Sequence, residues 1–134
     1  MRIMLDTNVL ISAFVFQSRC ISDMIDVLTE EHTIVLSSYV IEELKLVVSE
    51  KFGHKSLALD SFLAKLPFEF AYTPDNIDGS KYPVLRDKKD VPVLATAIIG
   101  DVDILLTGDK DFGTPDLERP AILTPASFMQ LYGR

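Results

Sequence analysis

Cysteine and histidine are scarce in this sequence, which has one cysteine and two histidines among 134 residues. The single Cys20 excludes an intramolecular disulfide, and we expect it to be a small buried or half-buried residue. His32 and His54 lie far apart in the sequence, so no cluster of thiolates and imidazoles is available to hold zinc. Stability therefore has to come from a packed core, and a domain near this size buries roughly 70% of the surface of its unfolded chain.

Long apolar runs are lacking as well. No stretch approaches the roughly 18 to 20 apolar residues that a membrane span needs. The apolar amino-terminal segment is interrupted at Asp6, and no small-residue cleavage site of a signal peptide follows it. The sequence therefore predicts a soluble, cytoplasmic protein with a single domain over residues 1–134.

An excess of basic residues is also missing. Thirteen Lys and Arg stand against twenty Asp and Glu, which gives a formal net charge of −7. This sign argues against a protein that binds RNA or DNA passively through bulk electrostatics. It argues less against a metal-dependent site, because carboxylates are needed there to hold cations, and the cations then invert the local field.

The hydrophobic pattern that is present predicts strands alternating with helices. Such alternation is typical of an α/β fold with a central, mainly parallel sheet and helices on both faces, a three-layer α/β/α arrangement. A polar loop is expected directly after Asp6, and the segment 73–90, rich in loop-forming residues, is expected to be irregular. The expected strands are 2–5, 33–36, 68–72, 104–106 and 121–123, and the expected helices are the low twenties to about 30, 38–52, 56–66, 91–99 and 125–131.

Two aspartates follow the ends of predicted buried strands. Asp6 comes directly after the strand at 2–5, and Asp109 lies two residues beyond Thr107, which follows the strand at 104–106. Ligands of open parallel sheets bind where the strands end at their carboxyl edge. We therefore expect Asp6 and Asp109 to lie at the same edge.

Two further acids reach this edge through helices. Asp90 precedes a helix that has to start there, because connections alternate across the sheet. Glu43 is one turn before the inward-facing Val47, whereas Glu42 lies farther round toward solvent. Glu43 is therefore the better candidate of the adjacent pair, with its side chain pointing back toward the carboxyl edge.

Each acid also has a structural interpretation of its own. Asp90 before Val91 and Pro92 suits a helix N-cap, Asp6 and Asp109 suit turns, and Glu43 alone suits a solvated helix face. The joint placement of the four favours a shared site. Carboxylates so close together repel one another unless a cation neutralises them, and oxygen ligands without cysteine or histidine select Mg²⁺ or Mn²⁺.

At these residues the sequence resembles the PIN-domain nucleases, over nearly the whole chain. The pattern is most similar to a prokaryotic branch described as toxin components of toxin–antitoxin pairs, the VapC-like ribonucleases. Each motif is short, but their order and spacing make a chance match improbable. The motifs are Leu5-Asp6-Thr7-Asn8, then Glu43-Leu44, then Arg86-Asp87 through Asp90 with Leu94, Ala95 and Ala97, then Thr107-Gly108-Asp109-Lys110-Asp111-Phe112, and Thr124-Pro125 with Phe128.

The resemblance implies an endoribonuclease dependent on Mg²⁺ or Mn²⁺, with Asp6, Glu43, Asp90 and Asp109 as the metal-binding acids and Asp111 as a candidate fifth. It also implies a homodimer and a cognate antitoxin protein. We assign Asp6 and Asp109 to the core of the metal site, and Glu43 and Asp90 to completing it.

Polar neighbours are expected to support this site. Asn8 and Thr107 are candidates for orienting a carboxylate or a metal-bound water, although each could equally stabilise its own turn. A basic set near the same edge is a candidate for phosphate contacts, and a solvated basic loop is an equal alternative. The basic set consists of Arg86, Lys88, Lys89 and Lys110.

Two other functions fit parts of the pattern. A haloacid-dehalogenase-like phosphotransfer enzyme also gathers aspartates at the carboxyl edge of a parallel sheet, but it usually has a second aspartate two residues after the nucleophile. This chain has Asn8 at that position. A catalytically idle PIN fold acting as an interaction module would be favoured by the loss of an acidic position, and all four acids are present.

Overall fold

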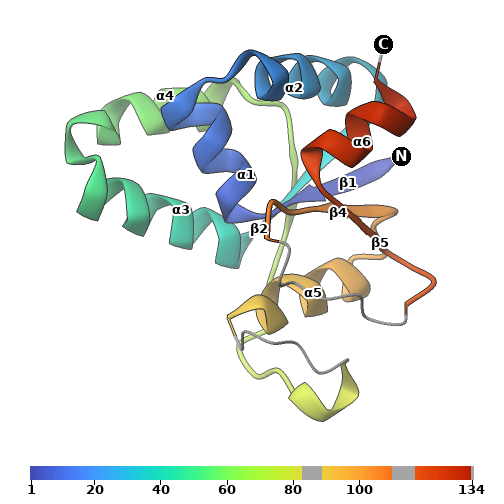
Figure 1. The fold of residues 1–134 in the computed structure, drawn as a ribbon. Helices are drawn as coiled ribbons and strands as arrows, with labels where there is room; N and C mark the ends of the chain where they lie inside the picture. The colour runs from blue at the N-terminus through green and yellow to red at the C-terminus, as the bar shows by residue number, and fades with distance from the viewer. Residues whose placement is uncertain (83–88, 110–116, 134) are drawn as a thin grey trace.

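The chain folds into alternating strands and helices, as the computed structural model of residues 1–82, 89–109 and 117–133 describes (Figure 1). The strands are β1 (Arg2–Leu5), β2 (Thr33–Ser37), β3 (Glu69–Ala71), β4 (Ile104–Leu106) and β5 (Ala121–Leu123). The α-helices are α1 (Thr7–Ile11), α2 (Arg19–Glu31), α3 (Ser38–Lys51), α4 (Ser56–Lys65), α5 (Asp90–Ile99) and α6 (Pro125–Tyr132). Shorter helical turns are η1 (Ser12–Phe16), η2 (Gly53–Lys55) and η3 (Gly79–Lys81). No helix in these ranges is long and apolar enough to cross a membrane.

The five strands form one parallel sheet in the order β3-β2-β1-β4-β5. From β1 the chain moves outward through β2 to β3, then returns past β1 to β4 and β5. The direction of strand addition therefore reverses between β1 and β4. In open parallel sheets the crevice at such a reversal, outside the carboxyl ends of the strands, is where ligands bind.

Helices cover both faces of the sheet, which confirms the predicted three-layer arrangement. Figure 1 shows α1 and α2 on one side of the sheet and α5 on the other. Connections between parallel strands are almost always right-handed. The outward steps from β1 to β3 therefore place their helices on one face, and the return from β3 to β4 carries α5 to the opposite face.

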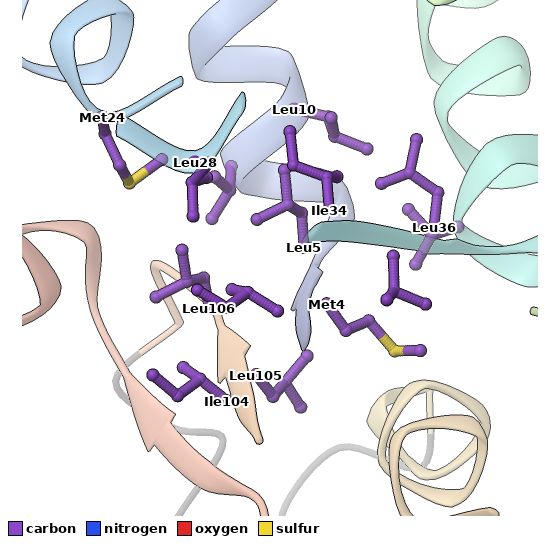
Figure 2. Close-up of a cluster of buried hydrophobic side chains, with 14 of the residues drawn as sticks. Met4, Leu5, Leu10, Met24, Leu28, Ile34, Leu36, Ile104, Leu105 and Leu106 are labelled. Carbon is purple, nitrogen blue, oxygen red and sulfur yellow. The ribbon is translucent and has the colours of Figure 1, made fainter. Parts of the chain in front are cut away.

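The core lies on both sides of β1, whose Ile3, Met4 and Leu5 are fully buried. Successive side chains of a strand point to opposite faces. Figure 2 shows Leu5 together with Leu10 and Leu28 on the side of α1 and α2, and Met4 on the side of α5. This packing on two faces explains why the strand is apolar throughout rather than alternating.

The predicted helix starts agree well with the observed caps. The Ser37 side chain accepts a hydrogen bond from the amide of Val40 at the start of α3, and Thr124 accepts from the amide of Ser127 at the start of α6. Pro125 occupies the first turn of α6, where its missing N–H costs nothing. Residues 73–82 and 89 contain only the short turn η3, in line with the expected irregular segment.

Three local expectations were wrong. The loop predicted after Asp6 is helix α1, because Asp6 itself is the N-cap and accepts from the amide of Thr7. Helix α5 begins at Asp90, one residue before the expected start, so Lys89 and not Asp90 occupies the N-cap position of the alternative interpretation. Cys20 is exposed, because it lies in the first turn of α2, whose inward face begins at Ile21.

Candidate active site

Strand register brings the segments after β1 and β4 together at the carboxyl edge. Leu5 pairs with Leu106, so the next residues, Asp6 and Thr107, leave the sheet side by side. The amide of Asp6 donates to the carbonyl of Leu106 at 2.9 Å, which continues the ladder by one bond. The site is thus built at the point where the strand order reverses.

Asp6 is held in one orientation by hydrogen bonds to both carboxylate oxygens. The Thr7 amide donates to Oδ1 at 2.8 Å, and the Thr107 hydroxyl donates to Oδ2 at 2.8 Å. The residue is only 5% exposed. Burial raises the pKa of Asp6 above its ordinary value because the charged form loses hydration, and the hydrogen bonds from Thr107 and Thr7 oppose that shift. The negative charges of Glu43 and Asp109 raise the pKa further.

Asn8 and Thr107 link the two segments around Asp6. The amide nitrogen of the Asn8 side chain lies 3.5 Å from Asp6 Oδ2 and 3.4 Å from Thr107 Oγ, and Asn8 Oδ1 accepts from the Gly108 amide at 2.9 Å. Thr107 Oγ also accepts from the Asp109 amide at 3.1 Å. Both residues therefore contact Asp6, the position expected of orienting groups, and they also stabilise the turn itself.

A hollow of about 250 Å³ opens beside Asp6, between α1, α3 and α5. We call it the acidic hollow. Its walls contain three of the four expected acids, and Glu43 is half-buried there while Glu42 is exposed, in agreement with the helical phase. Asp90 is also nearly buried, at 9% exposed. The lining residues are Asp6, Thr7, Asn8, Ile11, Glu43, Val47, Lys51, Lys89, Asp90 and Val93.

The fourth acid, Asp109, is half-buried near Asp6 but does not line the acidic hollow. Its backbone is held by Thr107, and its charge acts on Asp6. The candidate fifth acid, Asp111, lies outside the described residues, as do three of the four expected phosphate contacts, Arg86, Lys88 and Lys110. Lys89, the remaining one, is exposed and lines the acidic hollow.

The donor set of the acidic hollow suits a hard divalent cation. Its carboxylate, hydroxyl and amide oxygens are the ligands that Mg²⁺ and Mn²⁺ prefer. A cation would offset the loss of hydration that mainly raises the pKa of Asp6, and also the smaller repulsion by Glu43 and Asp109. Across residues 1–82, 89–109 and 117–133, however, no three Asp, Glu, His or Cys side chains lie close enough to hold a metal ion together. Like charges favour such a separation, and a cation would have to draw the carboxylates inward.

Size alone does not identify this site. A larger hollow, about 590 Å³, lies between η1, α2 and α4, but its walls contain no acid and a single charged residue, Lys65. Sequence reasoning missed several residues of the acidic hollow, notably Thr7 and Lys51. Thr7 follows Asp6 directly, and Lys51 could have been found by counting two helical turns from Glu43.

Comparison with known proteins agrees with this architecture. Residues 2–111 match the PIN domain family model, which covers β1 through β4 and all four expected acids. Twelve chains of solved structures match, and no curated protein matches the sequence. One similar structure is that of VapBC2 from Rickettsia felis bound to a DNA fragment from its promoter, with 23% identity, 92% of this chain and 97% of that chain covered, and a TM-score of 0.71. With the family match spanning most of its length and its acids gathered at the strand-order reversal, this chain belongs to the PIN-domain family.

Proposed function

We propose that this protein is a divalent-metal-dependent endoribonuclease that hydrolyses RNA phosphodiester bonds. The observation that carries the proposal is the acidic hollow, in which Asp6, Glu43 and Asp90 come from three separate elements. Buried carboxylates whose pKa is raised by desolvation and by neighbouring acids, as that of Asp6 is, cluster at functional sites. The haloacid-dehalogenase-like alternative is set aside because the chain belongs to another family.

The chain's own residues would hold and orient the cation. Asp6 is fixed by Thr7 and Thr107, so its remaining oxygen lone pairs keep a constant direction. Asp109, which we assign with Asp6 to the core of the metal site, would approach from outside the wall of the hollow, and Glu43 and Asp90 would complete the oxygen ligands. When bound, Mg²⁺ or Mn²⁺ supplies an activated water and neutralises charge on the phosphoryl oxygens. Asn8 keeps the Gly108 turn in place, which preserves the position of Asp109.

The biological setting we infer is a toxin–antitoxin pair, with this chain as the toxin component. Support comes from the motif pattern and from the similarity of the fold to VapBC2, a complex studied with promoter DNA. We propose a cognate antitoxin protein and a homodimer as the assembly. Co-expression with the product of an adjacent small reading frame, followed by purification, tests the pairing. Loss of RNA cleavage in the copurified complex is the expected result.

The activity itself is tested with a generic single-stranded RNA. We expect cleavage with Mg²⁺ or Mn²⁺, none in the presence of a chelator, and none by Asp6→Asn, which keeps the size of the side chain and its capping ability. A DNA oligonucleotide of the same sequence reports whether RNA is selected. Equal activity of wild type and Asp6→Asn would exclude catalysis at this site, and RNA binding without cleavage under all conditions would favour the idle interaction module.

A further inference from the structure

Two lysines line the acidic hollow together with its carboxylates. Lys89 is at the start of α5 and belongs to the expected basic set, whereas Lys51 lies in the last turn of α3 and was not expected. Lys51 is exposed, and within residues 1–82, 89–109 and 117–133 its ammonium group makes no hydrogen bond or ion pair. Lys51 therefore places a positive charge at the wall of the acidic hollow, in addition to Lys89, and has no protein partner among these residues.

The phase of α3 sets this position. Glu43, Val47 and Lys51 recur at intervals of four residues, and all three line the acidic hollow. Eight residues correspond to about 12 Å along a helix axis. Side chains on a helix lean toward its amino terminus, so the long Lys51 side chain is directed back toward Glu43. The α3 face thus presents a carboxylate and, two turns later, an ammonium group.

The helix dipole alone is a weaker explanation of Lys51. A positive charge in the last turn of a helix is favourable whichever way it faces. Glu50, in the same turn, is exposed and does not line the hollow, so the turn as a whole has no excess of positive charge. What distinguishes Lys51 from Lys45, another exposed lysine of α3, is that only Lys51 faces the hollow.

The net negative charge of the chain indicates what Lys51 does at this position. The chain has a net charge of −7, so its overall field repels a polyanion such as RNA. The three carboxylates of the acidic hollow add further negative charge. A cation bound there would offset the charge of the phosphate that it contacts, and the other phosphates of the strand would still be repelled. Neighbouring phosphates of the same strand need separate positive charges close by.

We propose that Lys51 binds a phosphate of the RNA substrate adjacent to the one at the carboxylates, so that the RNA backbone follows α3 from Glu43 to Lys51. This inference rests on the proposed function, since it identifies a binding subsite for the same substrate. Lys51 is a substrate-binding residue in this scheme and takes no part in the bond cleavage.

The test measures how RNA affinity depends on salt. Lys51→Ala and, as a matched control, Lys45→Ala are each made in the Asp6→Asn background, which prevents turnover. Binding of a fluorescein-labelled single-stranded RNA of mixed sequence is followed by anisotropy over a series of KCl concentrations. One lost phosphate contact lowers the slope of log K against log[salt] by about 0.7, which weakens binding about fivefold at 0.1 M salt.

We expect Lys51→Ala to lower the slope of log K against log[salt] in this way, and Lys45→Ala to leave it unchanged. Lys51→Arg keeps the positive charge and should have the slope of the parent. A parent that binds RNA with the same slope as its Lys51→Ala variant overturns the Lys51 contact and leaves the proposed function standing. A parent without salt-dependent RNA binding overturns the Lys51 contact, and the cleavage assay with the wild-type protein decides separately on the proposed function.

Discussion

At the scale of single residues, Thr107 determines how Asp6 is presented. Its hydroxyl donates to Asp6 Oδ2 and accepts from the Asp109 amide, so it connects two of the acids. We expect Thr107→Val to lower the free energy of unfolding by about 1 to 3 kcal/mol, because a buried carboxylate oxygen loses its donor. Urea unfolding at a constant m-value measures the loss. Thr107→Ser keeps the hydroxyl and should recover most of the stability and the RNA cleavage, and equal losses in both variants would contradict this role.

Asp6 also links stability to pH. Because burial raises its pKa in the folded state, the folded protein keeps this proton to a higher pH than the unfolded chain does. The contribution of Asp6 to stability is therefore full below its ordinary pKa of 3.8 and is lost as pH rises through the folded-state value. Above that window, ionised Asp6 destabilises the metal-free fold.

Asp6→Asn removes this titration and keeps the N-cap. In the presence of a chelator we expect the variant to unfold at a higher temperature than wild type at neutral pH, with the difference closing toward pH 4. Adding Mn²⁺ should raise the unfolding temperature of wild type and leave Asp6→Asn unchanged, since only wild type keeps the full ligand set. A metal-free Asp6→Asn variant that is less stable than wild type at neutral pH would contradict the burial argument.

At the scale of elements, α3 carries Glu43 into the acidic hollow, and its start depends on Ser37. Ser37 is fully buried and caps the amide of Val40. Ser37→Ala is expected to cost about 1 kcal/mol, the usual cost of losing a helix cap. Ser49→Ala, at an exposed site on the same helix, should change stability by less than about 0.5 kcal/mol. Chemical unfolding of the two variants gives the comparison, and similar midpoints would refute the importance of the cap.

The strands and the longer helices could be predicted from their hydrophobic patterns, whereas the short helices could not. Helix α2 was expected because Ile21, Met24 and Leu28 repeat at helical spacing, and all three face the core. Helix α1 was missed because it has five residues and includes the β-branched Val9, so propensity gives little signal. Its start is marked only by the Asp6 N-cap, and an aspartate after a strand is equally typical of a turn.

At the scale of the whole molecule, the fold extends beyond the residues that define the family match. The match ends at residue 111, whereas β5 and α6 follow it. Phe128 of α6 is fully buried, and its helix contacts α2. We expect Phe128→Ala to cost about 3 to 5 kcal/mol, the range for removing a core aromatic side chain. Leu131→Ala, at a residue that is 65% exposed, serves as the control and should be nearly neutral. Urea midpoints that coincide for the two variants would show that α6 is dispensable.

The convergence of the acids was predictable only in part. Asp6 and Asp109 could be placed at one edge because all strands of a parallel sheet end there, and Glu43 could be separated from Glu42 by helical phase. The strand order, and with it the reversal between β1 and β4, could not be derived from local patterns. The hollow itself depends on how α3 packs against α1 and α5, which local patterns do not contain, although the helical phase of Glu43 also places Lys51 on the same face of α3.

The most direct test of the central claim compares two adjacent glutamates. Glu43 lines the acidic hollow and Glu42 is exposed to solvent one residue away, so the pair is matched in charge, size and helix position. The rate of Mg²⁺-dependent cleavage of single-stranded RNA is measured for Glu43→Gln and Glu42→Gln. We predict a fall of about 100-fold or more for Glu43→Gln, as for other losses of electrostatic groups that act in a transition state, and a rate close to wild type for Glu42→Gln. Equal rates for the two variants would contradict a catalytic site in the acidic hollow.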